Sequence, residues 1–143
     1  MPFTFDSSIG FLINKAALRL KAELARAFNA AGYNATPEHW AVLNCLSELD
    51  GQTQTQLAGR VAKDKTNMTR ILGVMTRNGL VERRPHESDG RSYRVFLTEP
   101  GKELVGSLVP IAETVLKRAT RGLGPDDLAS IRKLMSQVSE NLE

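Results

Sequence analysis

The chain has 143 residues, of which 41% are hydrophobic and 24% are charged, and its formal net charge is +3. This size and composition are typical of one globular domain with extra terminal helices, and an aromatic content of 6% predicts an aliphatic core. The single cysteine, Cys45, excludes an intramolecular disulfide framework, and no apolar run approaches the roughly 18 residues of a membrane span. We expect a cytoplasmic protein, because the N-terminal sequence also lacks the basic region of a signal peptide.

Two helices are expected in the first third of the chain. Apolar residues recur at helical spacing over residues 7–31, and Gly32 ends that stretch. Thr36 and Pro37 are typical of an N-cap and a first helical position, so a second helix is predicted from there to about residue 49. The expected inward side chains are Ile9, Leu12, Ala16, Leu20, Leu24 and Phe28 in the first helix, and Trp40, Leu43 and either Leu46 or Leu49 in the second.

A helix-turn-helix is predicted next. Thr53 and Gln56 have the spacing of a capping box, which starts a third helix over about residues 54–62. Asp64 caps a fourth helix that ends at Asn78-Gly79. Only a few residues separate the two helices, which is the spacing of a motif whose second helix reads DNA. The residues expected to face the core from the fourth helix are Met68, Ile71, Leu72 and Met75.

A basic β-hairpin is expected to follow. Residues 80–84 are predicted to form a strand, and Pro85 is expected to end its pairing. A polar loop over residues 86–92 turns at Asp89-Gly90, and residues 93–97 alternate as the return strand. Residues 60–94 carry nine Lys or Arg and four Asp or Glu, a net +5, whereas the remainder of the chain is −2. This concentration of positive charge indicates a nucleic-acid-binding face.

The last third of the chain is expected to contain two amphipathic helices. Thr98 caps the fifth helix, which extends to about residue 121, and Gly124-Pro125 separates it from the sixth. Their apolar stripes are Leu104, Leu108, Ile111, Val115 and Ala119 in the fifth, and Leu128, Ile131, Leu134, Val138 and Leu142 in the sixth. A small winged core cannot cover these stripes and that of the first helix, so a second copy is expected to complete their burial. A closed monomeric bundle is the alternative.

The expected fold class is therefore mainly α with a small β-hairpin wing (α+β). Residues 36–98 would form a winged helix-turn-helix core that binds DNA. Residues 1–35 and 99–143 would form a helical lobe for dimerisation.

Four segments of the chain resemble the MarR family of bacterial winged-helix regulators: QTQLA at 54–58, residues 66–72, GLVERR at 79–84 and SDGRSYRVFLTEPG at 88–101. The most specific part is Asp89-Gly90-Arg91 followed by Leu97-Thr98 and Gly101. The resemblance extends across essentially the whole chain. It implies a homodimer that binds a pseudo-palindromic operator and, as in many members, releases DNA when a small molecule or an oxidant binds.

The start of the fourth helix carries the candidate DNA-reading residues. Thr66, Asn67, Thr69 and Arg70 offer short donors and acceptors and one guanidinium, which suit base edges and phosphates. Lys65 and Arg77 are expected to bind phosphates, which adds affinity and salt dependence without sequence reading. The alternative is an ordinary solvated helix face.

The hairpin supplies further candidates. By resemblance Arg91 enters the minor groove, where a guanidinium responds to the enhanced negative potential of narrow A/T-rich DNA. Asp89 is expected to orient Arg91 or a basic neighbour, unless it is simply a turn residue beside Gly90. Arg94, with Arg83 and Arg84, either contacts the DNA backbone or keeps a strand edge soluble.

Effector candidates are less specific. By resemblance His39 and Trp40 lie where the family's ligand pocket meets the first and fifth helices. The alternatives are an exposed surface position for His39 and a core position for Trp40. Lys15 and Arg19 are candidate partners of an anionic, aromatic effector, or else belong to a solvated face. Cys45 has no basic neighbour in sequence and is expected to be structural. No cofactor is expected, and two histidines and one cysteine far apart give no metal-ligand spacing.

The leading functional hypothesis is a homodimeric, sequence-specific DNA-binding regulator that represses until a small molecule releases it. A winged-helix protein-interaction module is the alternative, and the local charge of +5 disfavours it. An enzyme is not expected, because His86, Ser88 and Asp89 lie in a wing without an oxyanion hole and no phosphate-binding loop is present.

Overall fold

The computed structural model describes the fold of residues 3–86 and 89–143, with the side chains of 86–92 outside the described part. The described elements are α1 (Ile9–Ala30), α2 (Pro37–Glu48), β1 (Gln52–Thr53), α3 (Gln54–Arg60), α4 (Lys65–Arg77), β2 (Val81–His86), β3 (Asp89–Leu97), α5 (Glu99–Ala119) and α6 (Pro125–Asn141). The mainly helical fold with a small sheet is the one predicted. No helix among the described residues is long and apolar enough to cross a membrane.

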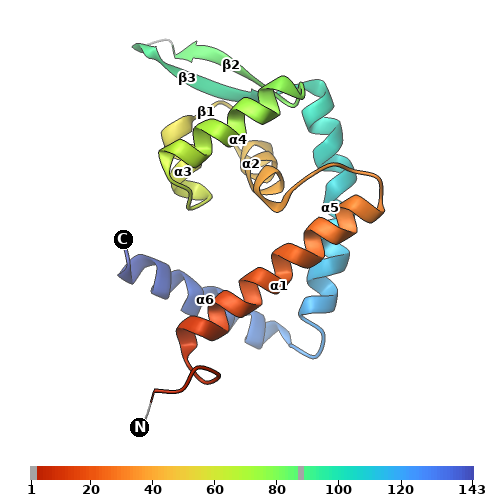
Figure 1. Cartoon of the computed structure of the whole chain (residues 1–143), viewed down its shortest axis with the longest axis vertical. Coiled ribbons are helices and arrows are strands. Elements are labelled where there is room, and N and C mark those ends of the chain that lie inside the picture. Colours follow the sequence, from red (N-terminus) through yellow and green to blue (C-terminus); the bar gives the residue numbers. More distant parts are fainter. Residues whose placement is uncertain (1–2, 87–88) are drawn as a thin grey trace.

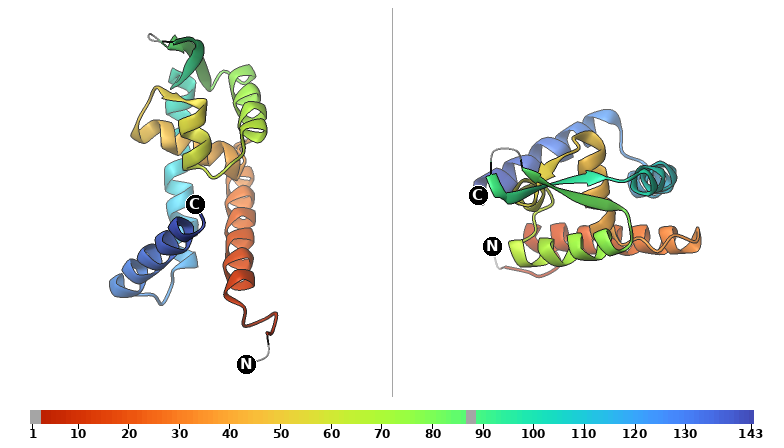
Figure 2. Two further views of the ribbon diagram at one scale, coloured as in Figure 1. Left: turned by 90° about the vertical axis from the view of Figure 1, so that its left-hand side faces the viewer. Right: turned by 90° about the horizontal axis from the view of Figure 1, so that it is seen from above.

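The molecule has two ends, which α5 connects (Figure 1). The sheet and α2, α3 and α4 lie at one end, while most of α1, the second half of α5 and α6 lie at the other. Helix α1 packs against α5, and it runs obliquely across α5 in Figure 1. Helix α6 extends away from this pair (Figure 2).

The predicted starts of α2, α3 and α4 are confirmed, and each is fixed by a local hydrogen bond to a side chain. The Oγ1 atom of Thr36 accepts the amide of His39 at 3.1 Å. Thr53 and Gln56 form the reciprocal capping box that starts α3. An Asp64 carboxylate oxygen accepts the Asn67 amide at 2.8 Å at the start of α4. These short-range interactions satisfy amides that a helix leaves unpaired, which is why the residue types alone predict them.

The core is aliphatic, as predicted, and it is centred on the winged end. Phe28 is buried and meets Trp40 edge to face, with 6.0 Å between ring centroids. Leu49 is 62% exposed, so Leu46 is the inward residue at the end of α2. The largest fully buried side chains among the described residues are Phe28, Val42, Leu43, Leu46, Leu57, Met68, Ile71, Leu72, Met75, Val81, Val95 and Leu108.

The sheet differs from the predicted hairpin in three ways. A third strand, β1, pairs with β3 through Gln52 and Val95, and the strand order is β1-β3-β2. Strand β2 continues through Pro85, which pairs with Tyr93, so the prediction that Pro85 ends the pairing is wrong. Proline is tolerated there because β2 is an edge strand, where alternate N–H groups point away from the sheet.

The predicted loop over residues 86–92 is also too long. Strand β3 already begins at Asp89, so the Asp89-Gly90 turn is wrong and the connection between the strands is shorter. The hairpin extends beyond its apolar base because ladder hydrogen bonds between backbones hold two strands together without apolar side chains.

Backbone contacts fix the base of this hairpin. An Asp50 carboxylate oxygen accepts the Leu97 amide at 2.9 Å, and the Thr98 hydroxyl donates to the Gly79 carbonyl at 2.6 Å. Gly101 lies so close to the connection between α4 and β2 that an added Cβ would be 2.1 Å from the Leu80 carbonyl oxygen. Thr98 and Gly101 therefore join α5 to the wing, which gives a physical reason for residues that carried the family resemblance.

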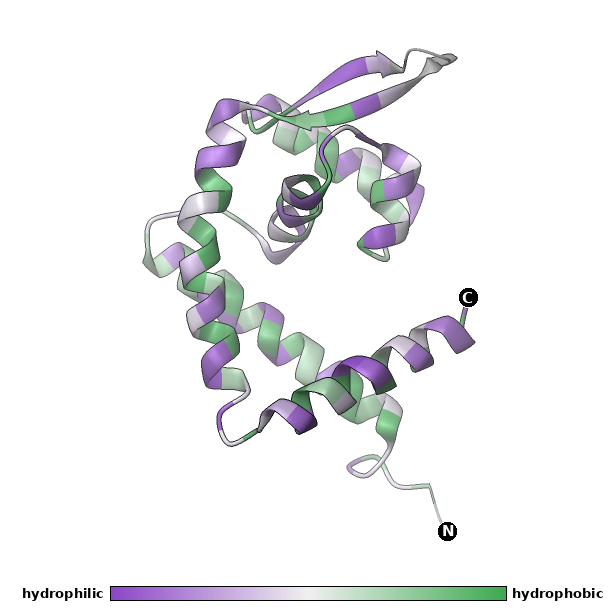
Figure 3. Cartoon of the chain, turned by 180° about the vertical axis from the view of Figure 1, so that it is seen from behind, coloured by the Kyte–Doolittle hydropathy of each residue, from purple (hydrophilic) through white to green (hydrophobic). Residues whose placement is uncertain are grey.

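The terminal helices bury less than their patterns predicted. In α1 only Leu24 and Phe28 are buried, while the predicted inward residues near its start are exposed. Helix α5 buries Leu108 and Val115, as predicted. It also buries Val105 and Ala112, whereas Leu104 and Ile111 are only half-buried and Ala119 is exposed, so its inward face is rotated in part from the predicted one. No residue of α6 is buried, although hydrophobic and hydrophilic segments alternate along it in Figure 3. The lobe thus leaves apolar surface uncovered.

Candidate nucleic-acid interface

Helix α4 separates an apolar face from a polar one. Met68, Ile71, Leu72 and Met75 are at most 1% exposed. All six residues proposed to contact DNA from this helix are exposed: Lys65, Thr66, Asn67, Thr69, Arg70 and Arg77. The apolar face fixes the helix on the core. The helix itself lies beside the hairpin (Figure 1). This is the arrangement of a reading helix and its wing.

Hydrogen bonds within the motif already engage two of these residues. The Thr69 hydroxyl donates to the Lys65 carbonyl at 2.9 Å and accepts from Nε2 of Gln54 at 2.5 Å. The Asn67 side-chain amide donates to Asp64 at 3.0 Å. Thr69 therefore links α4 to α3, and Asn67 extends the N-cap. Sequence reasoning missed Gln54, whose partner lies 15 residues away.

Sequence reasoning also missed Glu38 at the start of α2. Its carboxylate accepts a hydrogen bond from Arg70 Nη2 at 3.2 Å and lies 3.7 Å from Lys63 Nζ. Glu38 therefore partly neutralises a cation of the reading helix and another in the turn before it. Next to it His39 is half-buried, and its pKa is lowered mainly by desolvation, with smaller contributions from Glu38, which raises it, and Arg70, which lowers it.

We expect Glu38→Gln to raise DNA affinity two- to fivefold at low salt, roughly the strength of an exposed ion pair. The reason is that Arg70 and Lys63 would lose a competitor for DNA phosphates. Fluorescence anisotropy with labelled DNA at several salt concentrations measures the change. Glu48→Gln is the matched control, because Glu48 holds the exposed Arg60 at 2.8 Å. Weaker binding by Glu38→Gln would instead mean that Glu38 positions Arg70 for the DNA.

The wing candidates are only partly described. The Asp89 and Arg91 side chains lie outside the described residues, so their roles remain predictions. Arg94 is exposed on β3. Arg84 is engaged by Glu82 and lies over the Phe96 ring, 4.1 Å from its centroid. Arg83 is exposed and points to the other face of the hairpin, because side chains alternate along a strand.

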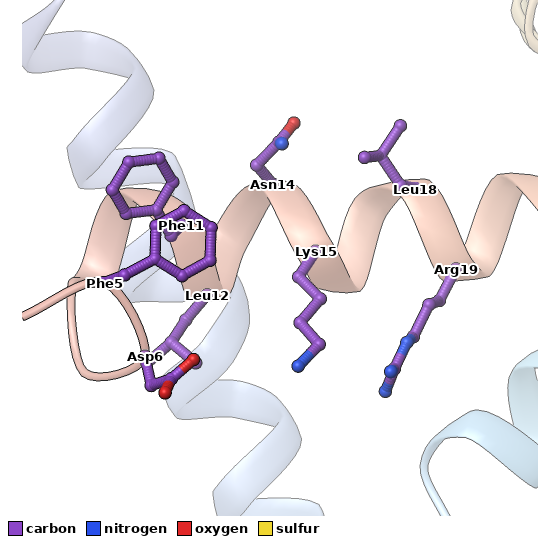
Figure 4. A pocket seen from close by; sticks show the side chains of 8 residues that line it. All are labelled: Phe5, Asp6, Phe11, Leu12, Asn14, Lys15, Leu18 and Arg19. Carbon is purple, nitrogen blue, oxygen red and sulfur yellow. The ribbon is translucent and has the colours of Figure 1, made fainter.

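The four effector candidates do not gather in one place. Lys15 and Arg19 line an open groove of about 570 Å³ at the N-terminal part of α1. Figure 4 shows both cations on the same side of the helix, with Phe5 and Phe11 near one end. Phe5 and Phe11 stack with 4.1 Å between centroids. His39 and Trp40 do not line this groove, and Trp40 packs on Phe28 instead.

Cys45 is half-buried on α2, and desolvation raises the pKa of its thiol despite the opposing effect of Arg60. A raised pKa disfavours the reactive thiolate. Among the described residues, no three His, Cys, Asp or Glu side chains are grouped to hold a metal ion.

These features define a winged helix-turn-helix protein, and comparisons with known proteins agree. The MarR family profile matches residues 35–93. The helix-turn-helix transcriptional regulator YkoM of Bacillus subtilis is 30% identical over 133 residues, which cover 85% of each chain. The structure of BpsR of Bordetella bronchiseptica, whose DNA binding is regulated by 6-hydroxynicotinic acid, matches with a TM-score of 0.87 and 23% identity over 97% of this chain and 98% of that one. The repressor CouR bound to a 23-mer DNA duplex matches with a TM-score of 0.83 and 22% identity over 97% and 99%.

The chain belongs to the MarR family, as its motifs predicted. It is a DNA-binding transcriptional regulator, since members of this family regulate transcription and are not enzymes.

Proposed function

We propose that this protein is a homodimeric repressor that binds a pseudo-palindromic operator and is released by a small molecule. The observation that carries the proposal is the exposed polar face of α4 beside the hairpin, at the opposite end from uncovered apolar helices. CouR, which shares the fold, is a repressor seen on DNA, and BpsR is regulated by a small aromatic acid.

Uncovered apolar residues on α1 and α6 support the homodimer. Leu134 is 58% exposed, Ile131 45% and Ile9 66%. An isolated amphipathic helix such as α6 is stable only when its apolar face is covered. A second copy offers the same stripes, so residues 1–35 and 99–143 act as the dimerisation lobe and residues 36–98 as the DNA-binding core. Two copies of α4 then lie about 34–36 Å apart, one turn of DNA.

An anionic aromatic molecule is the proposed effector. The groove at Lys15 and Arg19 combines two cations, which have no ionic partner among the described residues, with the apolar side chains of Phe11 and Leu18, and Asp6 contributes one carboxylate to its lining. A ligand there would bind beside the proposed dimer surface and alter the separation of the two reading helices. Coupling of this kind is typically about 1–3 kcal/mol, which is enough to release an operator.

Replacing both Arg70 and Arg91 with Ala tests the assigned DNA face. We expect the double variant to lose most of its operator affinity at moderate salt, because one cation leaves the reading helix and one leaves the wing. A shift assay on genomic fragments, with the wild type at increasing salt, makes the measurement. Unchanged binding by the double variant would show that the face is wrongly assigned. A wild type that retains no DNA would favour the protein-interaction module.

A further inference from the structure

A small cavity lies where the hairpin meets the starts of α3 and α4. Its volume is about 200 Å³, below the range typical of small-molecule pockets. Lys65, the first residue of α4, and Arg83, on β2, both line it. The lining also includes Tyr93 and Val95 of β3 and Thr55 of α3. The cavity is thus shared by both proposed DNA-contacting elements.

The hairpin's geometry directs Arg83 to this cavity. Arg83 pairs with Val95 across the β2–β3 ladder, and directly opposed residues project to the same face of a sheet. Tyr93 lies two residues before Val95 and therefore shares that face. Glu82 and Arg84 alternate to the other face, where they pair with each other. Strand β2 thus sends one arginine to each side, and of these two it is Arg83 that faces the helices.

The charges around the cavity are not balanced. Neither Lys65 nor Arg83 has an ionic partner among the described residues, and no described residue lining the cavity is acidic. By contrast, Glu48 pairs with Arg60, Glu38 with Lys63 and Arg70, and Glu82 with Arg84. Two unneutralised cations beside a threonine hydroxyl and a phenol form a site for an anion with several acceptor oxygens.

We propose that this cavity holds one backbone phosphate of the DNA in each half-site, bound jointly by Lys65 and Arg83 with Thr55 and Tyr93 at its edge. The inference rests on the proposed DNA binding and deepens it. A phosphate bound between wing and reading helix fixes the distance between their two contacts on DNA, and it contributes no sequence reading. The site therefore sets the position of the protein on its operator.

The test is a double-mutant cycle on the full-length protein. Lys65→Ala and Arg83→Ala are each expected to weaken binding to operator and unrelated DNA by about tenfold, and to lower the salt slope by about one. Because both residues bind the same phosphate, the double variant is expected to lose clearly less than the product of the two effects. Arg60→Ala, which removes a cation already paired with Glu48, should leave the salt slope unchanged. The effects of Lys65→Ala and Arg77→Ala on DNA affinity should multiply.

DNA with single neutral methylphosphonate linkages identifies the phosphate. At one position in each half-site, the neutral linkage is expected to lower the DNA affinity of the wild type about tenfold. The same linkage should not lower the affinity of the Lys65→Ala/Arg83→Ala variant any further. Multiplicative effects, or no position that the double variant ignores, would overturn the proposal. Binding of inorganic phosphate, measured by ³¹P NMR, gives a further test. If the variants lost phosphate binding but kept their DNA affinity, the proposal would be overturned, because the site would then bind free phosphate. If the wild type binds operator and the variants bind it with the same affinity, only this phosphate site is refuted. If the wild type binds no DNA, the proposed function itself is refuted.

Discussion

Leu134→Glu is expected to convert the protein into a folded monomer with at least about hundredfold weaker operator affinity. Leu134 is 58% exposed on a helix that buries none of its own residues, so the substitution removes little intramolecular packing. In the proposed dimer the new carboxylate would have to be desolvated between two apolar helices, which is costly. Loss of the second copy also removes the avidity of two linked half-site contacts, a factor of roughly 10²–10⁴.

Sedimentation velocity measures the first effect and fluorescence anisotropy with operator DNA the second. Leu49→Glu is the matched control, because Leu49 is 62% exposed at the end of α2, outside the proposed dimer surface. The control should remain dimeric and bind operator normally. A Leu134→Glu protein that sediments like the wild type at micromolar concentration would show that α6 does not form the interface.

Gly101→Ala is expected to destabilise the protein by about 3 kcal/mol, in the upper range for overpacking a tight contact. The added Cβ would lie 2.1 Å from the Leu80 carbonyl oxygen, and that oxygen accepts the Thr98 amide at 3.1 Å. Backbone cannot move aside as a flexible side chain does, so the junction of α4, the hairpin and α5 must shift. The wing would then move relative to the reading helix, and DNA affinity should fall as well.

Gly106→Ala on the same helix separates this clash from a general effect of alanine. An added Cβ at Gly106 meets nothing within 4 Å, so the substitution should stabilise α5 by about 0.5–1 kcal/mol. Chemical denaturation of both variants measures the two changes. If Gly101→Ala were as stable as the wild type, close approach of the Leu80 carbonyl would not be the reason for glycine at this position.

Local signals made much of the fold predictable. Thr36, Thr53 and Asp64 act through hydrogen bonds to amides three residues away, and the apolar face of α4 follows one clear period. The inward face of α5 was wrong in part because Leu104-Val105 and Ile111-Ala112 offer two adjacent stripes. Periodicity alone does not choose between them, and contact with α1 decides.

Long-range interactions account for what the sequence did not predict. Strand β1 has only two residues, and it exists because Gln52 and Thr53 pair with Val95 and Arg94 more than 40 positions later. The Glu38–Arg70 ion pair spans 32 residues, and the Lys65–Arg83 cavity depends on how the hairpin packs on two helices. Composition predicted a basic face, but only the fold shows which cations carboxylates already neutralise.

Paired reading of DNA by two copies of α4 is tested by sequencing the genomic fragments that the purified protein retains. The expected result is one shared inverted repeat whose half-site centres lie about 10–10.5 base pairs apart, one helical turn. Retained fragments with no common motif, or with a single unpaired half-site, would contradict it.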